Sequence, residues 1–385
     1  MKIKAIAAAM ALLAGPVSAD TQGVTADTIK IGSLADLSGP LSIGGAPSIR
    51  AARMRFDQVN EAGGIHGRKI EFITEDTKYE IPLAARFANK LVRKDRVFAV
   101  LLSTGTPANL AAMEIQDKAG VPNLFPLTSA KSMFEPLSPL HFSLFVGSPE
   151  QAGGALKYFH GKDGISKICM QTVANDYGQE TVNGVEATAE ELGITISVRG
   201  SHKVTETDFS GTATAIKNSD CELLILGTTV KDTINLYATL RKLGWDKPVV
   251  GNMVPYLPLV AEAGDGATEG LYLVAPYVIA DFEDGDPFRA KFRADYSAEY
   301  GEHPNIYAQN GYTAADILVQ ALEKAGPELT TETLVEGLES IASYEDPFGG
   351  PNYSFGPDKH AGGTRLVLVQ SRNRAWEIVE TDLPF

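Results

Sequence analysis

The sequence lacks the short motifs that mark catalytic, nucleotide-binding and metal-binding sites. It contains no G-x-x-x-x-G-K-[ST], H-E-x-x-H, G-x-S-x-G or C-x-x-C pattern. The stretch Gly39–Gly45 lies between a predicted strand and a predicted helix, but its spacing is not the G-x-G-x-x-G of dinucleotide sites. The histidines are scattered along the chain, at His66, His141, His160, His202, His303 and His360. We therefore expect no metal, no cofactor and no enzymatic activity.

Long apolar runs are also missing. No stretch reaches the roughly 18 consecutive apolar residues of a membrane-spanning helix, so no membrane anchor is expected. At the N-terminus, Lys2 and Lys4 precede the apolar run Ala5–Ala14, and the small residues Val17–Ala19 follow. This order predicts a signal peptide over residues 1–19, cleaved near Ala19, and hence a periplasmic protein. No cysteine lies at the cleavage site, which disfavours a lipid anchor.

Positive charge is scarce relative to negative charge. The chain has 34 Lys and Arg against 48 Asp and Glu, a formal charge of −14, which becomes −16 once Lys2 and Lys4 leave with the signal peptide. Nucleic acids and anionic membrane surfaces are therefore poor partners. The charge does not identify a ligand.

Cysteine is limited to Cys169 and Cys221, each in or beside an apolar, strand-like run. An oxidising compartment permits a disulfide between them. Buried free thiols fit the same pattern, so both alternatives stay open.

The chain alternates short β-branched runs with longer helical patterns, as parallel sheets covered by helices require. The predicted strands are Thr28–Leu34, Lys69–Thr74, Val97–Leu102, Val121–Pro126, Lys167–Thr172, Thr195–Val198, Glu222–Thr228, Pro248–Gly251, Arg365–Gln370 and Ala375–Val379. The predicted helices include Pro47–Asn60, Leu83–Arg93, Pro107–Ala119, Phe288–Tyr300, Ile306–Lys324 and Thr331–Ser340. Leu140–Phe145 is predicted to cross from the first series of units to the second.

The predicted fold class is α/β, with two doubly wound, Rossmann-like lobes joined by a hinge of several crossings. A chain of 385 residues exceeds the usual domain of roughly 100–200 residues, yet no Gly/Ser/Pro-rich linker divides it. We expect the first lobe to contain residues 20–142 and 276–347, and the second lobe residues 143–275 and 348–385. Such lobes can close on a ligand about their hinge.

Candidate ligand-binding residues follow the third and fourth predicted strands, because open α/β lobes bind ligands at the carboxyl ends of their strands. Ser103 is followed by Thr104, Gly105 and Thr106 at the start of a helix, and the next strand is followed by Leu127–Ser129 (Leu127, Thr128, Ser129). Hydroxyls and backbone N–H groups at a helix N-terminus suit a carboxylate. The alternative is an ordinary N-cap and polar turn.

Three tyrosines lie at other predicted strand ends, Tyr79, Tyr177 and Tyr256. Each could cover a ligand face or donate its hydroxyl. Each could equally be a half-buried packing residue.

Several longer motifs together resemble the type I periplasmic binding proteins of the leucine/isoleucine/valine group, which supply ABC importers. The similarity covers the whole predicted mature chain. Its motifs are Ile29–Gly32, Leu37–Pro40 (LSGP), Asn60–Ile70 (NEAGGIHGRKI), Asp76–Pro82 (DTKYEIP), Ala119–Pro122 (AGVP), Asn175–Gly178 (NDYG), Leu243–Trp245 (LGW) and Gly311–Asp316 (GYTAAD).

The resemblance implies a ligand enclosed between two lobes, with its carboxylate held at Thr104–Thr106 and Leu127–Ser129. Tyr177 would close over the ligand from the second lobe, and Thr229 occupies a position that is often aromatic in the group. The acid that pairs with an amino-acid ammonium falls near Met253 here. A basic residue often present after the crossover is absent from Phe142–Phe145.

These departures leave two ligand classes open. Removing an ammonium group from water without a carboxylate partner costs several kcal/mol. This cost favours an aliphatic or aromatic carboxylate that has no ammonium group, with its apolar body packed against Met253 and the tyrosines. A shifted loop could instead bring Glu206, Asp208 or Asp232 to an amino-acid ammonium.

We expect a monomer whose partners are this ligand and an ABC membrane permease. A ligand-sensing subunit of a periplasmic signalling system is the alternative.

Overall fold

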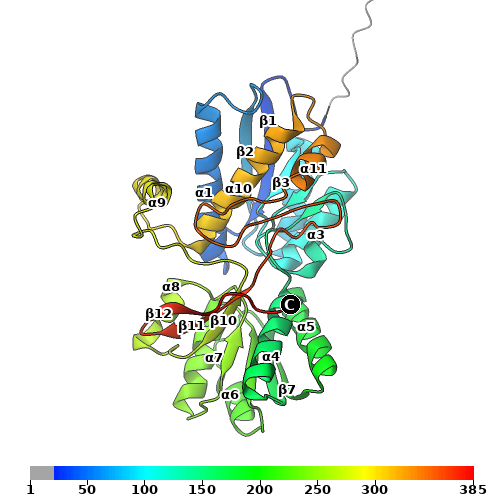
Figure 1. Ribbon diagram of the computed structural model, residues 1–385. Coiled ribbons are helices and arrows are strands. Elements are labelled where there is room, and N and C mark those ends of the chain that lie inside the picture. The colour runs from blue at the N-terminus through cyan, green and yellow to red at the C-terminus, as the bar shows by residue number, and fades with distance from the viewer. Residues whose placement is uncertain (1–20) are drawn as a thin grey trace, which may run out of the picture.

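The chain folds into two lobes, each built around its own β-sheet (Figure 1). The computed structural model describes residues 21–385. The first lobe has a five-stranded sheet in the order β2-β1-β3-β4-β5, and the second a seven-stranded sheet in the order β12-β11-β10-β9-β8-β6-β7. Helices cover both sheets, so the predicted fold class of two doubly wound α/β lobes is confirmed. The predicted signal peptide lies outside the described residues.

The first sheet is entirely parallel. Its strands are β1 (Thr28–Ala35), β2 (Lys69–Asp76), β3 (Ala99–Leu101), β4 (Asn123–Leu124) and β5 (His141–Phe142). Its helices are α1 (Ser42–Glu61), α2 (Ile81–Asn89) with a π-helical continuation at Lys90–Asp95, α3 (Thr106–Asp117), a 3-10 turn at Lys131–Met133, α9 (Pro287–Tyr300), α10 (Ile306–Ala325) and α11 (Thr331–Glu339).

The second sheet is parallel except for its last hairpin, in which β11 runs antiparallel to both β10 and β12. Its strands are β6 (Lys167–Val173), β7 (Thr195–His202), β8 (Leu223–Gly227), β9 (Val249–Gly251), β10 (Tyr272–Ala275), β11 (Val367–Arg372) and β12 (Ala375–Glu380). Its helices are α4 (Ser148–Asp163), α5 (Asp176–Leu192), α6 (Ser210–Lys217), α7 (Val230–Lys242), α8 (Pro258–Ala261) and a 3-10 turn at Ala263–Asp265.

Helix α1 begins earlier than the sequence predicts. Pro47 lies inside the helix and not at its start. A proline has no N–H to donate to the carbonyl four residues before it, which is that of Ile43. The side-chain amide of Asn305 donates to that carbonyl instead, at 3.3 Å. The helix therefore continues through the proline, and its N-terminal turn reaches the edge of the first lobe.

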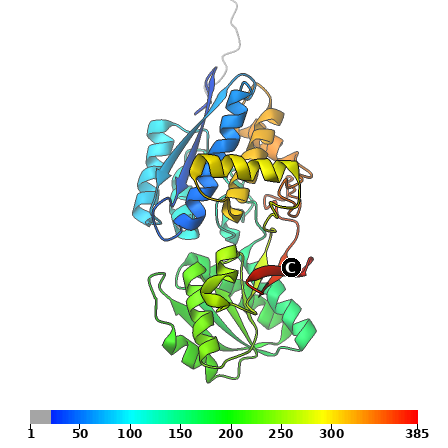
Figure 2. The same ribbon diagram turned by 90° about the vertical axis from the view of Figure 1, so that its left-hand side faces the viewer.

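Three segments cross between the lobes, as Figures 1 and 2 show. One joins β5 to α4, one follows β10, and one precedes β11. Part of the predicted crossing at Leu140–Phe145 forms β5, which pairs with β4. The exact lobe boundaries stay a prediction. Phe355, predicted in the second lobe, packs against Phe125 and Phe142 of the first lobe, with ring centroids 5.6 and 6.1 Å away.

Cys169 and Cys221 form a disulfide, with their Cα atoms 5.6 Å apart. Cys169 lies in β6, and Cys221 lies just before the neighbouring strand β8. Both are buried. The disulfide is thus the alternative that the structure supports, and it links two adjacent parallel strands in the core of the second lobe.

Within residues 21–385, no helix is both long enough and apolar enough to cross a membrane.

Candidate ligand-binding cleft

A cleft of about 570 Å³ lies between the two lobes. This volume is within the range of about 300–1,000 Å³ that is typical of small-molecule sites. The first lobe contributes Gly39–Gly45, Thr104, Leu127 and Tyr307, the crossing before α4 contributes Phe145, and the second lobe contributes Val204–Thr207, Thr229–Asp232, Asn235, Met253 and Val254. Most of the surface that lines the cleft is apolar, and its charged residues, Glu206, Lys231 and Asp232, all belong to the second lobe.

The segment Gly39–Gly45, which leads into the first turn of α1, forms part of the first-lobe wall and is held by a buried acid, Asp36. The Asp36 carboxylate accepts hydrogen bonds from the backbone N–H of Gly39 (2.5 Å) and of Leu41 (2.8 Å). A Cβ atom on Gly45 would lie only 2.1 Å from the Asp36 carbonyl oxygen, so this close approach requires glycine. We did not predict this segment as a binding element. The available signal was the set of glycines that follows Asp36, the acid directly after β1.

The first predicted hydroxyl loop reaches the cleft through Thr104. Its Oγ1 is buried and has no hydrogen-bond partner within residues 21–385. Gly105 precedes α3 with φ 82° and ψ 154°, a conformation essentially reserved for glycine. Thr106 begins α3, and its hydroxyl lies 2.7 Å from that of Thr128. One unpaired hydroxyl and the first N–H groups of a 12-residue helix therefore meet at the first-lobe wall.

The second predicted hydroxyl loop lies mostly behind that wall. Leu127 lines the cleft. Thr128 is bonded to Thr106, and the Ser129 hydroxyl lies 2.8 Å from the Ser148 hydroxyl. The structure therefore brings both loops together at neighbouring strand ends, but their hydroxyls pair mainly with protein groups.

Tyr79 lies at the edge of the interface between the lobes. Its ring packs against Gly105, where an added Cβ would be 2.3 Å from a ring carbon. Its hydroxyl accepts a hydrogen bond from the Asn175 side chain of the second lobe at 3.4 Å. Burial raises the pKa of Tyr79 to about 12, so the hydroxyl stays protonated at neutral pH. Tyr79 therefore touches the second lobe but is not among the residues that line the cleft.

Tyr177 and Tyr256 are buried within the second lobe. The Tyr177 hydroxyl accepts from the Asn252 amide (2.7 Å) and donates to the Thr228 carbonyl (3.2 Å). The Tyr256 ring stacks on Tyr277 with centroids 6.0 Å apart. Burial raises the pKa of both, in Tyr256 to about 12. Neither side chain lines the cleft in this conformation.

Thr229 and Met253 line the second-lobe wall. Thr229 caps helix α7 and shares a capping box with Asp232. Met253 is held by its backbone, since its N–H donates to Gln151 (3.2 Å) and its carbonyl accepts from Tyr277 (3.2 Å). Glu206 and Asp232 also line the cleft, whereas Asp208 does not.

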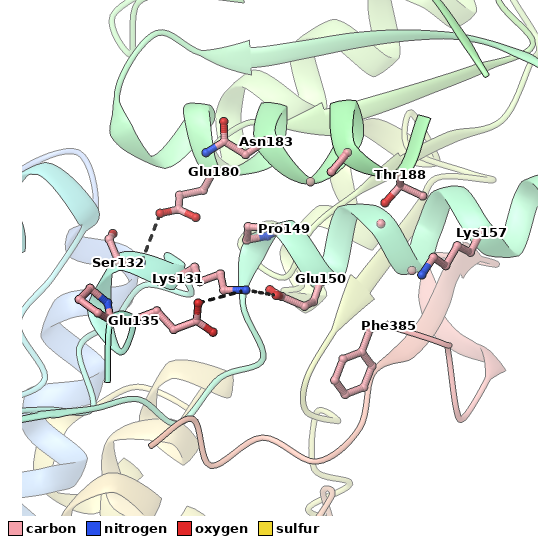
Figure 3. A pocket seen from close by; sticks show the side chains of 15 residues that line it. Lys131, Ser132, Glu135, Pro149, Glu150, Lys157, Glu180, Asn183, Thr188 and Phe385 are labelled. Carbon is pink, nitrogen blue, oxygen red and sulfur yellow. Dashed lines mark hydrogen bonds and ion pairs between the residues drawn. The ribbon is translucent and has the colours of Figure 1, made fainter. Parts of the chain in front are cut away.

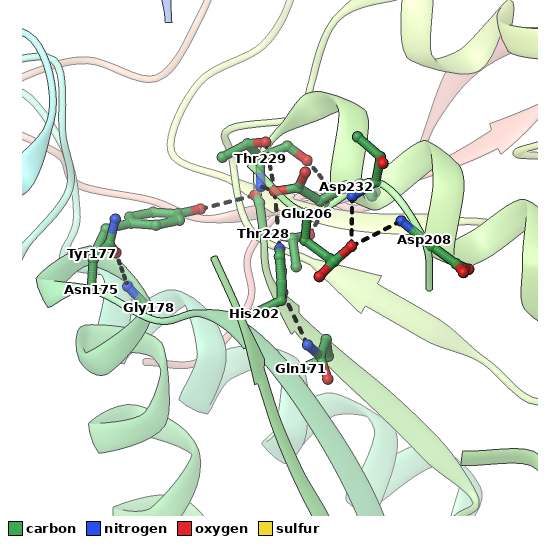
Figure 4. A network of polar contacts seen from close by, with 12 residues as sticks. Gln171, Asn175, Tyr177, Gly178, His202, Glu206, Asp208, Thr228, Thr229 and Asp232 are labelled. Atoms are coloured by element: carbon green, nitrogen blue, oxygen red, sulfur yellow. Dashed lines mark hydrogen bonds and ion pairs between the residues drawn. The ribbon is translucent and has the colours of Figure 1, made fainter. Parts of the chain in front are cut away.

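His202 was not predicted as a site residue. It forms a polar network with Gln171, Asp232 and Thr229 behind the second-lobe wall (Figure 4). His202 ends β7 and Thr229 follows β8, so the rule that functional groups gather at strand ends could have found it.

A second, more open groove of about 720 Å³ lies beside the 131–136 segment, α4, α5 and the C-terminal Phe385 (Figure 3). Lys131 is paired there with Glu135 (3.2 Å) and Glu150 (3.0 Å). The Ser132 N–H donates to Glu180 of the second lobe at 3.4 Å. Its charged groups are thus largely occupied by one another, and the cleft between the lobes is the better ligand site.

Comparisons with known proteins agree with this geometry. A family model described as periplasmic binding protein matches residues 28–375. The leucine-, isoleucine-, valine-, threonine- and alanine-binding protein of Pseudomonas aeruginosa is 26% identical over 85% of this chain and 86% of that protein. A fatty acid ABC transporter substrate-binding protein from Thermomonospora curvata has a TM-score of 0.83 at 23% identity, covering 95% of this chain and 94% of that one.

A branched chain amino acid ABC transporter structure from Thermus thermophilus, with bound valine, has a TM-score of 0.82 at 20% identity and covers 93% of this chain and 96% of that one. At these identities the two structures establish the fold. The family match covers most of the chain, so the resemblance to the leucine/isoleucine/valine group is confirmed. The chain belongs to the periplasmic binding protein family, whose members are solute-binding proteins and not enzymes.

Proposed function

We propose that the chain is the extracytoplasmic solute-binding subunit of an ABC importer. It binds a small carboxylate-bearing ligand with an apolar body between its lobes and presents the closed form to a membrane permease. The observation that carries this proposal is the cleft itself, which is mostly apolar and has an unpaired buried hydroxyl, that of Thr104, beside a helix N-terminus.

The carboxylate is assigned to the first-lobe wall. Its ligands would be the Thr104 hydroxyl and the backbone N–H of Thr106, whereas the Gly105 N–H already donates to the Leu127 carbonyl at 3.3 Å and joins the two loops. The positive end of the α3 dipole favours an anion at this position. The residues that line this wall include no acid that would repel it.

The apolar body is assigned to the rest of the cleft. Leu41, Ile43, Phe145, Met253 and Val254 offer it a largely aliphatic surface. Burial contributes about 25 cal/mol per Å² of apolar area, so a branched aliphatic group burying about 100 Å² gains about 2.5 kcal/mol. This fits both open ligand classes, amino acids and carboxylates without an ammonium.

Closure would be assisted by hydrogen bonds that already join the lobes. The Tyr307 hydroxyl of α10 donates to the Val254 carbonyl at 3.0 Å, and Asn175 donates to Tyr79. Tyr177 and Tyr256 are assigned a supporting role behind the second-lobe wall. Three crossing segments supply the hinge.

Isothermal titration of the purified mature chain with leucine, valine, benzoate and 4-methylpentanoate tests this function. Thr104→Val removes the unpaired hydroxyl at almost constant volume. It should weaken binding of the preferred carboxylate about tenfold to a hundredfold, because a hydrogen bond to a charged group contributes about 1.5–3 kcal/mol. Thr214→Val, at an exposed position of α6, is the matched control and should bind like the wild type. The proposal fails if no carboxylate of this size binds, and the carboxylate assignment fails if Thr104→Val binds normally.

A further inference from the structure

Asp232 is a buried acid on the wall of the cleft. The residue is 3% exposed, yet it lines the cleft in the first turn of α7. A buried carboxylate is costly unless its oxygens are paired or hydrogen-bonded. The contacts of its two oxygens therefore indicate what the site can still bind.

Within the described part of the chain, the polar contacts of the Asp232 side chain are all made through a single oxygen, Oδ2. The Thr229 hydroxyl donates to Oδ2 at 2.7 Å, and the Thr229 N–H lies 3.3 Å away. His202 Nε2 lies 3.1 Å from the same oxygen. Oδ1 has no hydrogen-bond partner within residues 21–385.

His202 lies beside this carboxylate, but its Nε2 makes no hydrogen bond within residues 21–385. Gln171 Nε2 lies 2.9 Å from His202 Nδ1, so the amide donates and Nδ1 accepts. Nε2, the other ring nitrogen, faces Asp232 (Figure 4). The ring, held by Gln171, therefore packs closely against the carboxylate and limits where it can lie.

No lysine or arginine within residues 21–385 forms an ion pair with Asp232. Lys231 lines the same wall but forms no ion pair with Asp232 within the described residues. The N-terminal dipole of α7 offsets only part of the charge. The nearby Glu206 adds a second acid to the wall. The second-lobe wall is thus ready to accept a positively charged donor.

We propose that Asp232 is a specificity-determining residue whose free Oδ1 binds an ammonium group on the second-lobe end of the ligand, with His202 and Gln171 as positioning residues. The proposal rests on the proposed function and deepens it. In this proposal, Asp232 in the first turn of α7 takes the role of the acid that the resemblance leads one to expect near Met253. Of the two open ligand classes, it selects the one that carries an ammonium.

Three probes of similar shape separate the two ends of the ligand. Leucine carries both groups, 4-methylpentanoate carries only the carboxylate, and 3-methylbutylamine carries only the ammonium. Titration of the mature wild-type chain should show leucine bound at least about tenfold more tightly than 4-methylpentanoate, the size expected for a charged hydrogen bond. Equal or tighter binding of 4-methylpentanoate overturns the Asp232 proposal and leaves the proposed function standing. Failure of all three probes to bind overturns both.

Asp232→Asn keeps the size of the side chain and removes its charge. It should lower the preference for leucine over 4-methylpentanoate by about tenfold to a hundredfold. Asp208→Asn is the charge-matched control, because Asp208 is an exposed acid near the same wall but outside the cleft. It should leave the preference unchanged. A preference retained in Asp232→Asn, or lost equally in both variants, overturns the proposal.

His202→Phe tests the positioning role, since it keeps a flat ring but removes both ring nitrogens, the one bonded to Gln171 and the one that lies 3.1 Å from Oδ2. The readout is again the ratio of the two affinities, which a general loss of folded protein would not change. The ratio should fall about tenfold in His202→Phe and recover in part in His202→Gln, whose amide can donate to Asp232. If His202→Phe does not fold, His202→Gln alone carries the comparison. An unchanged ratio in every folded His202 variant overturns the positioning role.

Discussion

Gly105→Ala should destabilise the chain strongly, because two independent features of this position require glycine. With φ 82° and ψ 154°, the backbone occupies a region that side-chain-bearing residues reach only at a cost of about 1–3 kcal/mol. The added Cβ would also lie 2.3 Å from a Tyr79 ring carbon, so the ring must move. Overpacking of this kind costs about 1–3 kcal/mol. Together they predict a loss of about 3 kcal/mol in the free energy of unfolding.

Urea denaturation followed by circular dichroism measures this loss as a lower midpoint at an unchanged slope. Gly161→Ala is the matched control. Gly161 lies inside α4 with no heavy atom within 4 Å of an added Cβ, so alanine should stabilise the chain by about 0.5–1 kcal/mol. If Gly105→Ala lowers the free energy of unfolding and Gly161→Ala raises it, the change in stability depends on the position and not on the loss of a glycine as such.

The two contributions can be separated by removing the ring. In a Tyr79→Ala background, Gly105→Ala no longer meets the ring, so its cost should shrink to the backbone part alone. Because Gly105 lies at the proposed carboxylate position, the single variant should also bind carboxylates more weakly. A Gly105→Ala chain as stable as the wild type would refute the reasoning.

Further predictions follow from other contacts. Burial raises the pKa of Asp346 from 3.8 to about 6, so the folded chain binds this proton more tightly than the unfolded chain. Its contribution to the free energy of unfolding should therefore fall as pH rises from about 4 to about 6, and denaturation of Asp346→Asn across this range should lack that fall. Replacing Cys169 and Cys221 by alanine removes a disulfide between residues 52 positions apart in the sequence. The free energy of unfolding, measured by thermal unfolding, should fall by about 4 kcal/mol. Tyr307→Phe removes the hydrogen bond to Val254 and should weaken ligand binding about fivefold in titrations, without unfolding either lobe.

The sheets could be predicted because a strand buried on both faces has an unmistakable composition. All five residues of β8 are buried, and its sequence Leu-Leu-Ile-Leu-Gly is a continuous apolar run. The start of α1 could not be predicted in the same way. Pro47 normally suggests a helix start, and here a side chain far along the chain, Asn305, satisfies the carbonyl that the proline leaves free.

The individual roles of the predicted site residues depended on partners far away in sequence. The strand-end rule placed Thr104 and Leu127 at the cleft, since neighbouring parallel strands end at one edge of the sheet. It did not distinguish Tyr256, whose ring stacks on Tyr277, from a ligand-facing aromatic residue. Nor did it indicate that Thr106 and Thr128 would bond to each other. Which side chains pair in this way depends on their three-dimensional positions, and the sequence alone does not give these positions.

The two walls of the cleft differ in charge. The first-lobe wall offers hydroxyls and a helix N-terminus, which suit any carboxylate, whereas all charged lining residues, Asp232 among them, lie on the second lobe. These groups stand on loops and first helical turns after the strands, where substitutions leave the sheets intact. Under the proposed function, the first lobe therefore sets the class of ligand, and the second lobe, once closed, decides which member of the class is kept.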